Sequence, residues 1–475
     1  MVAAIQDPLY RSGYALVVNT AGTTVIGVAY WAVAAHLYDQ SELGRSSALV
    51  SALLLISAVA QLNFGNTLPR FLPLAFRRSG RLIGYSYGVS SLTAAAAGVG
   101  FVLIMPAVNA HWRFLGESAA LGILFAAAAV IWGIFSLEDA ALTGLRHTGV
   151  VPVENTVYGV LKLALLVAVA GLLPSTGIFV SWVAPLLLII PVINVLIFRR
   201  YLREGPGRVG EGDMGSRVRP REVIRFASVD YIGALLNQVY SNLLPLLVLS
   251  TLGAAANGRF YVAWTITTGL VLVATNFATS LLVEGASAPE KLAELTRGVL
   301  ARCALVVTLG VVVIVVAARP ILSVYGSSYA SHAASLLGLL VVGVLPRSLV
   351  IITFSLDRLE RKVGRATLTN LVLTVLVLGG SWVSLPRVGL TGVALAWLVG
   401  NLIIAIVRLP TLVRAVRHRP ADEPARAASI WQIGAPDRTA RSGSGNGPGR
   451  HRAPARDKPP RSPGQAPDPD SASPS

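Results

Sequence analysis

One apolar stretch of the sequence carries polar side chains at helical spacing. The stretch is VENTVYGVLKLALLVAVAGLL, residues 153–173. Glu154, Tyr158 and Lys162 recur in it at intervals of four residues, and Asn155 lies beside the first of them. Residues four apart share a face of an α-helix, so these side chains form one polar stripe. A carboxylate can bind a proton or a cation and an ammonium can bind an anion, so the stripe predicts a site for charged groups.

Lys162 lies too deep in this apolar stretch for its charge to reach bulk water easily. If the helix enters the membrane near Val151, a rise of 1.5 Å per residue places Lys162 about 16 Å from the surface. A charge at this depth must meet water, an acid or a ligand inside the protein. The alternatives are contact with an anionic group of a ligand or an ion pair with Glu138 or Asp139 of the preceding apolar segment.

A second polar stripe, in the apolar segment 226–250, combines a carboxylate with amides. Its members are Asp230, Asn237, Gln238 and Ser241. A carboxylate inside a membrane protein can bind a proton or Na⁺, or pair with a cation, and Asp230 could face Lys162 across a cavity. The alternative is that Asp230, close to Arg225, is a solvated or capping residue near the membrane surface.

Arg70, near the end of the second apolar segment, is a candidate for a pyrophosphate contact, because a guanidinium fits phosphate oxygens in a bidentate way. The alternative is an ordinary basic anchor at the membrane surface. The predicted substrate-binding residues are thus Lys162, Arg70, Asn237 and Gln238. The residues predicted for ion coupling or a salt bridge are Asp230 and Glu154.

The composition places these segments in a membrane protein. Of the 475 residues 54% are hydrophobic and only 13% are charged, with a mean hydropathy of +0.65. A soluble globular domain is far less apolar. The net charge of +17 would suggest nucleic acid in a soluble protein, but here the basic residues crowd into loops and a tail. Membrane topology explains that pattern, and no nucleic-acid partner is expected.

Several kinds of site are not expected from the sequence. The single cysteine, Cys303, permits no disulfide framework or CxxC motif, and the six histidines show no metal-ligand spacing. No glycine-rich phosphate-binding loop is present, which argues against direct use of ATP. We therefore expect neither an enzyme nor a bound metal or cofactor.

Hydropathy predicts an all-α protein with twelve membrane-spanning helices. The predicted spans are 14–37, 46–64, 84–107, 118–142, 153–173, 178–198, 226–250, 260–283, 299–318, 333–355, 366–385 and 389–410.

The basic residues of the loops predict the orientation, because Lys and Arg near span ends stay in the cytoplasm. One set of loops carries most of them: Arg70, Arg77, Arg78, Arg81, Arg146, the run in residues 199–221, Lys291, Arg297, Arg358, Arg361, Lys362 and Arg365. The opposite loops carry only Arg45, Arg113, Arg259, Arg319 and Arg387. We therefore predict a multi-pass protein of the cell membrane with both termini in the cytoplasm.

The two halves of the chain form a tandem repeat. The matching positions are Asn155 with Asn370, Thr176–Gly177 with Thr391–Gly392, and Trp182 with Trp397, all 215 residues apart, together with Gly44–Arg45 and Gly258–Arg259, and Asn63–Phe64 and Asn276–Phe277, at nearly the same separation. This separation contains six spans, so two six-helix lobes should be related by a pseudo-two-fold axis along the membrane normal. Lys162 has no charged counterpart, since Val377 occupies its place in the second half.

The repeat and the composition predict four regions. Residues 1–198 form the N-terminal lobe, 199–225 a cytoplasmic linker, 226–411 the C-terminal lobe, and 412–475 a disordered basic tail rich in Pro, Gly and Ser. The tail is expected to be solvated, with contacts to anionic lipids or to glycan-assembly proteins as the alternatives.

Two motifs carry a resemblance to a known family. LGRSSALVSALLLISAVAQLNFGNTLPRFLP and VGLTGVALAWLVGNLI resemble the second and last spans of the polysaccharide (Wzx-like) flippases, in the superfamily that includes multidrug and toxin extrusion proteins and the lipid II flippase. The resemblance covers about residues 10–412. The major facilitator superfamily shares the two-lobe plan, but the loop GNTLPRFLPLAFRRSGRLIG lacks the aspartate of its motif.

The resemblance implies a two-lobed transporter that moves a lipid-linked oligosaccharide across the cytoplasmic membrane by alternating access. A cation-coupled, multidrug-type antiporter is the alternative. A scaffold that recruits glycan-assembly proteins through its basic tail is a third possibility.

Overall fold

The structure is a computed structural model that describes residues 25–75, 78–202 and 220–417, with the backbone alone for residues 220–230. The predicted linker lies mostly outside this part of the chain, and the predicted tail almost wholly. Both therefore stay predictions.

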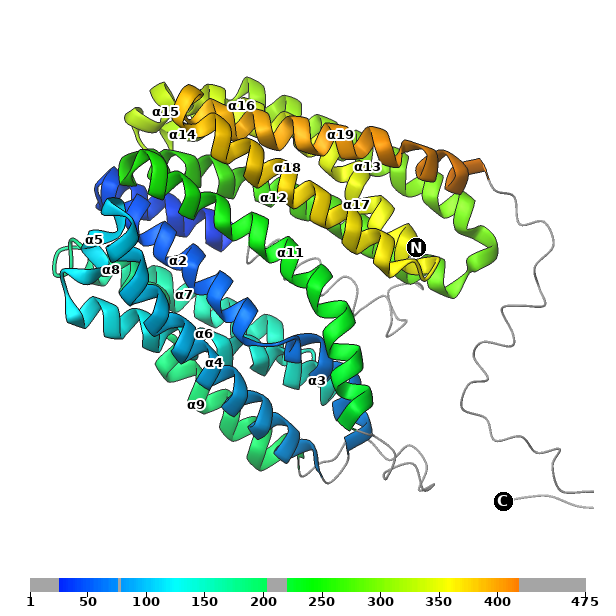
Figure 1. The fold of residues 1–475 in the computed structure, drawn as a ribbon, viewed down its shortest axis with the longest axis horizontal. Coiled ribbons are helices and arrows are strands. Elements are labelled where there is room, and N and C mark those ends of the chain that lie inside the picture. The colour runs from blue at the N-terminus through cyan, green and yellow to red at the C-terminus, as the bar shows by residue number, and fades with distance from the viewer. Residues whose placement is uncertain (1–24, 76–77, 203–219, 418–475) are drawn as a thin grey trace, which may run out of the picture. The chain divides into compact units, whose positions relative to one another are not determined.

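All secondary structure of the described residues is helical (Figure 1). Val25–Leu37 comes first. The N-terminal half continues with α2 (Gln40–Ala60), α3 (Phe64–Ala75), α4 (Ser79–Val108), η3 (Ala110–Trp112), α5 (Arg113–Gly116), α6 (Ala119–Gly144), α7 (Val150–Val169), α8 (Gly177–Val183), α9 (Leu186–Leu196) and η4 (Ile197–Tyr201). The C-terminal half contains α11 (Pro220–Leu252), α12 (Ala254–Ser287), η5 (Pro289–Lys291), α13 (Leu292–Val316), α14 (Ala318–Ser323), α15 (Ser327–His332), α16 (Ala334–Val342), α17 (Val344–Leu359), α18 (Val363–Val388) and α19 (Leu390–Arg417).

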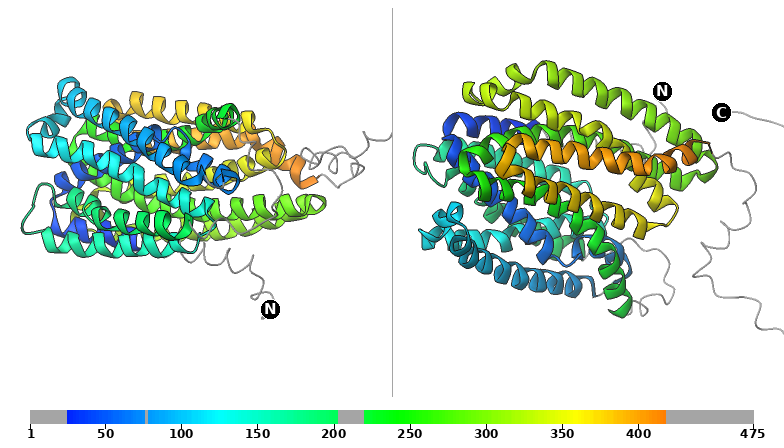
Figure 2. Two further views of the ribbon diagram at one scale, coloured as in Figure 1. Left: turned by 90° about the horizontal axis from the view of Figure 1, so that it is seen from below. Right: turned by 45° about the horizontal axis from the view of Figure 1, so that its top comes forward.

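Eleven helical segments of the described chain are long and apolar enough to cross a membrane. They are Gln40–Ala60, Ser79–Val108, Ala119–Gly144, Val150–Val169, Gly177–Tyr201, Tyr231–Leu252, Ala254–Ser287, Pro289–Val316, Ala334–Leu359, Val363–Val388 and Leu390–Arg417. Val25–Leu37, a shorter apolar helix, lies within the first predicted span, and the long helices run alongside one another (Figure 2). The protein is thus an all-α membrane protein of twelve spans in two six-helix lobes, as predicted.

The second span is shifted toward the N-terminus from its predicted limits. It begins at Gln40 instead of residue 46, so Arg45 lies in the helix and not in a loop. It ends at Ala60, because Leu62 and Asn63 adopt the left-handed region with φ of 47° and 66°. Asparagine tolerates this region better than most residues, and a new helix, α3, starts directly afterwards. Hydropathy averaged over a long window does not detect such a break, since apolar residues precede and follow it.

The repeat is visible in the backbone as well as in the sequence. Arg146 follows α6 with a φ of 64°, and Arg361, which lies 215 residues later, follows α17 with a φ of 58°. In each turn the next residue closes the helix end: the His147 amide donates to the Leu142 carbonyl at 2.9 Å, and the Lys362 amide to the Asp357 carbonyl at 2.7 Å. These are the hydrogen bonds of a left-handed helix cap.

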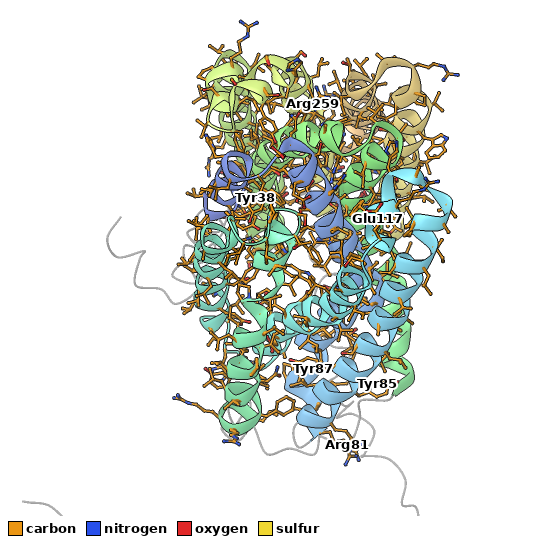
Figure 3. The ribbon with its side chains drawn as sticks, turned by 90° about the vertical axis from the view of Figure 1, so that its left-hand side faces the viewer. Tyr38, Arg81, Tyr85, Tyr87, Glu117 and Arg259 are labelled. Atoms are coloured by element: carbon orange, nitrogen blue, oxygen red, sulfur yellow. The ribbon has the colours of Figure 1, made fainter. Side chains whose placement is uncertain are left out.

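The lobes meet where repeat-related glycines approach each other. α2 packs against α12, and a Cβ added to Gly44 would overlap the Ala254 carbonyl oxygen. A Cβ added to Gly258 would overlap the Gln40 carbonyl oxygen. The Asn257 side chain donates to the Gly44 carbonyl at 2.8 Å. Figure 3 shows Arg259, next to this contact, at the opposite end of the molecule from Arg81 of α4. The end that carries Arg259 is the one predicted to be extracytoplasmic.

Candidate functional site

Lys162 lies inside a cage of aromatic rings. Its Nζ is 3.8 Å from the ring centroid of Trp182 and 5.0 Å from those of Tyr30 and Tyr158. Only 7% of the residue is exposed. Electron-rich ring faces attract a cation, and the attraction reaches about 2 kcal/mol or more where water is excluded. The cage therefore stabilises a charge that the apolar span would otherwise disfavour.

Hydrogen bonds and further rings hold the cage in place. The Tyr30 hydroxyl donates to the Ile178 carbonyl at 2.9 Å, and the Tyr158 hydroxyl to the Trp182 carbonyl at 2.9 Å. Trp132 packs against both Tyr158 and Trp182, with centroids 6.0 and 6.1 Å apart. The cage residues thus come from three segments: Val25–Leu37, α7 and α8. Sequence spacing alone could relate only Tyr158 to Lys162.

Lys162 has no acidic partner in the described part of the chain. It forms no ion pair and donates no hydrogen bond there. The expected alternative, pairing with Glu138 or Asp139, is therefore wrong for this structure. Glu138 Oε1 accepts a hydrogen bond from Asn194 Nδ2, and Asp139 Oδ2 accepts one from Asn155 Nδ2 at 3.4 Å. The three N–H donors of Lys162 remain available to an anion.

Glu154, two turns from Lys162 on α7, belongs to a separate acidic group. It is 3% exposed, neither of its carboxylate oxygens has a hydrogen-bond partner, and its carboxyl group lies against that of Glu138. The polar stripe of α7 is therefore divided, with its acid facing α6 and its lysine facing α8. Asn155 belongs to the acidic part.

Arg347 of α17 is a buried cation that the sequence analysis missed. It is 3% exposed, its Nη2 donates to Asn237 Oδ1 at 3.2 Å, and its Cζ lies 5.2 Å from the Tyr240 ring centroid. Its Nε and Nη1 are buried without partners. An arginine inside the apolar run GVLPRSLVIITF is the kind of residue that identified Lys162, so the same argument would have found it.

The other predicted residues are not gathered into one site by the structure. Asn237 and Gln238 are both exposed on α11, and of the two only Asn237 contacts Arg347. Arg70 lies exposed on α3, outside the spans, with its guanidinium 5.8 Å from the Phe71 ring centroid. The side chain of Asp230 lies outside the described residues, so its predicted role is untested.

Asp357 of α17 and Arg408 of α19 form a buried ion pair in the C-terminal lobe. Asp357 is fully buried and Arg408 is 3% exposed, and Arg365 lies 4.0 Å from the same carboxylate. This buried pair of opposite charges joins α17 directly to α19.

A small cavity of about 240 Å³ lies beside Glu42, Arg45 and Glu117, toward the end of the molecule opposite Arg81 (Figure 3). None of the predicted site residues lines it. Among the residues that the structure describes, no group of three or more His, Cys, Asp and Glu side chains is arranged to hold a metal ion.

Comparisons with known proteins agree on the fold. No family model and no curated protein sequence matches the chain. A similar solved structure is the inward-facing conformation of a multidrug resistance MATE family transporter of the MOP superfamily, with a TM-score of 0.62 and 16% identity over 83% of this chain and 94% of that chain. The outward-facing conformation of such a transporter gives a TM-score of 0.61 at 14% identity, over 86% and 95% of the two chains.

A third similar structure is a MOP superfamily transporter from Pyrococcus furiosus, in which the reverse polarity of the binding pocket suggests a different function. Its TM-score is 0.60 at 14% identity, over 86% of this chain and 95% of that chain. At such identities the likeness shows the fold, which is that of the superfamily to which the sequence resemblance pointed. The assignment to the polysaccharide flippases stays a prediction.

Proposed function

We propose that this protein is a transporter that moves a lipid-linked saccharide precursor across the cytoplasmic membrane by alternating access. The observation that carries the proposal is a buried cation without an acidic partner in each lobe. Lys162 and Arg347 are at least nine-tenths buried, and the described residues offer neither of them a carboxylate. A phosphate or pyrophosphate group that links a saccharide to its lipid would supply the missing negative charge.

The two cations lie at matching depths. Lys162 comes twelve residues after the start of α7, and Arg347 comes twelve residues before the end of α17. With a rise of 1.5 Å per residue, each lies about 18 Å from its predicted cytoplasmic helix end, near the middle of the bilayer. An anionic headgroup that crosses the membrane needs positive charge at this depth, where its own desolvation is greatest.

The contact between the lobes fits alternating access. α2 and α12 meet at Gly44 and Gly258, toward the predicted extracytoplasmic end. Pseudo-two-fold lobes of this kind can separate at one end of the spans while they close at the other. The headgroup would be held by cations from both lobes during this change, so that the saccharide moves without crossing lipid.

A vesicle assay tests the proposal. The purified protein is reconstituted with a polyprenyl-diphosphate oligosaccharide, and its appearance in the opposite leaflet is measured. Lys162→Ala and Arg347→Gln each remove a charge-assisted contact worth about 1.5–3 kcal/mol, so each should slow transport by about tenfold to a hundredfold. Lys291→Ala, at an exposed lysine of η5, is the matched control. Unchanged transport by both Lys162→Ala and Arg347→Gln would refute the assignment.

The second candidate is a cation-coupled small-molecule antiporter. The observation that favours it is the acidic group of Glu138, Asp139 and Glu154, which has no cationic partner among the described residues. Efflux of a cationic dye that is lost in Glu154→Gln or Asp230→Asn, but kept in Lys162→Ala, would support this function and exclude the first.

A further inference from the structure

Glu138 and Glu154 bring two carboxyl groups together inside the N-terminal lobe. Glu138 is on α6 and fully buried, and Glu154 is on α7 and 3% exposed. The two carboxyl groups lie within hydrogen-bonding reach of each other. Tyr87 of α4 approaches both, and Figure 3 shows it at the same end of the molecule as Arg81. The pair therefore lies toward the predicted cytoplasmic end of the lobe.

Several oxygen atoms at this place lack a partner. Glu138 Oε2, both oxygens of Glu154 and the Tyr87 hydroxyl are buried without a hydrogen bond. Glu138 Oε1 alone is satisfied, by the amide of Asn194 on α9. A buried acceptor without a donor costs about 1–3 kcal/mol, and more when it is charged. Glu154 in particular is a buried, unpartnered side chain directed at a second carboxyl group.

The charged and titratable groups that surround the pair do not neutralise it. The titratable groups are Tyr87 from α4 and Asp139 from α6, and the neutral amides of Asn155 on α7 and Asn194 on α9 donate to the acids. Asp139 adds negative charge, although Asn155 donates to it. Lys162 is two turns away on α7, and its Nζ lies between aromatic rings. No described cation forms an ion pair with any of these acids.

We infer that Glu138 and Glu154 form a proton-binding site in which one proton is shared by the two carboxyl groups. Two carboxylates in contact within an apolar interior repel each other and lack solvation, so they cannot both be ionised. One bound proton leaves a single negative charge on the pair and creates the O–H donor that the unpartnered oxygens need. This site does not depend on the proposed substrate.

Infrared spectroscopy of the full-length protein in lipid vesicles, without substrate, tests the inference. A protonated carboxyl group has a C=O absorption distinct from that of a carboxylate, and an exposed glutamate, which ionises near about pH 4.3, does not contribute to it at neutral pH. The wild-type protein should show this band. Glu138→Gln and Glu154→Gln should each abolish the contribution of the pair to this band, because the amide supplies the donor and the remaining carboxyl group stays ionised.

Glu284→Gln, at an exposed residue of α12, is the matched control and should leave the band unchanged. A band that survives in full in either Glu138→Gln or Glu154→Gln overturns the shared proton. If a glutamine variant does not fold, Tyr87→Phe keeps both carboxyl groups and should shift the band by removing a neighbouring hydroxyl. An unshifted band in Tyr87→Phe would then overturn the inference.

Discussion

The two lobes share one backbone plan but treat a buried acid in opposite ways. In the C-terminal lobe, Asp357 joins α17 to α19 through an ion pair with Arg408. In the N-terminal lobe, Glu138 joins α6 to α9 through the neutral amide of Asn194. In the register of the repeat, Glu138 lies one turn before the position of Asp357, and Asn194 lies one residue after that of Arg408. The C-terminal acid lies beside the cations Arg408 and Arg365, whereas the N-terminal acid lies beside a second carboxyl group and forms no ion pair with a described cation.

The two buried cations without acidic partners also lie on spans that do not correspond to each other in the repeat. Lys162 lies on the fifth span and is matched by Val377, whereas Arg347 lies on the tenth span and is matched by Trp132, both at a separation of 215 residues. Each cation contacts aromatic rings, which are Trp182 for Lys162 and Tyr240 for Arg347. The fold therefore requires a charge at neither position. Each lobe has acquired its own, and such an asymmetric pair suits an asymmetric anionic ligand better than it suits packing.

The largest expected effect is the loss of stability when the partner of a buried acid, Asp357 or Glu138, is removed. Arg408→Met removes the cation of the C-terminal ion pair and leaves Asp357 buried without its main partner, so the free energy of unfolding should fall by about 3–5 kcal/mol. Asn194→Leu, the corresponding change in the N-terminal lobe, should cost only about 1 kcal/mol, because a carboxyl pair that holds a proton keeps an internal donor. Unfolding from mixed micelles by a denaturing detergent measures both.

The double variant Asp357→Leu with Arg408→Met is the control, since it removes the unpaired charge and should recover most of the lost stability. If Asn194→Leu costs as much as Arg408→Met, the contrast between an acid held by a cation and an acid held by a neutral amide fails.

The contact between the lobes comes next in size. Gly44→Ala places a Cβ onto the Ala254 carbonyl, and Gly258→Ala places one onto the Gln40 carbonyl. Overpacking of this kind costs about 1–3 kcal/mol, so the population closed at the extracytoplasmic end should fall by about fivefold to 150-fold. Labelling of Ser51→Cys by an impermeant maleimide, in a Cys303→Ser background, measures the opening.

Gly88→Ala in α4 is the matched control, because a Cβ there meets no atom within 4 Å. Gly44→Ala and Gly258→Ala should increase labelling to a similar degree, since repeat-related glycines form the contact from both sides. A strong increase with only one of them would show that the lobes do not contribute equally.

The sequence predicts the architecture well, because apolar length and loop charge are local properties. The spans and the repeat follow from runs of Leu, Val and Ala and from matched polar residues. The break after Ala60 could not be predicted, since it depends on the backbone of Leu62 and Asn63 and not on hydropathy. The prediction that Arg45 lies in a loop is wrong for a related reason, because the helix begins before the apolar residues that hydropathy detects.

The site was harder to predict, because its contacts join distant segments. The burial of Lys162 followed from its depth, but its partners did not: Tyr30 and Trp182 come from two other helices. Trp182 was recognised only as a marker of the repeat. The alternative in which Lys162 pairs with Glu138 or Asp139 assumed that opposite charges on neighbouring spans must meet, whereas in the structure these side chains face different neighbours.

The smallest expected effect compares the two repeat-related tryptophans. Trp397 Nε1 donates to the Leu340 carbonyl at 3.1 Å, whereas Trp182 Nε1 is buried without a partner. Trp397→Phe should therefore lower the free energy of unfolding by about 1 kcal/mol through the lost hydrogen bond. Trp182→Phe loses no hydrogen bond and keeps a ring beside Lys162, so its cost should be about 0.5 kcal/mol, the weakened cation–π contact.

The same micelle unfolding measures both tryptophan variants, and the vesicle assay separates stability from function. Because Trp182 faces Lys162, Trp182→Phe should slow transport more than Trp397→Phe does, although it costs less stability. The reverse order in transport would mean that the ring beside Lys162 only fills space. Lys162 would then be a buried charge stabilised by packing, and the asymmetry between the lobes would carry no function at this position.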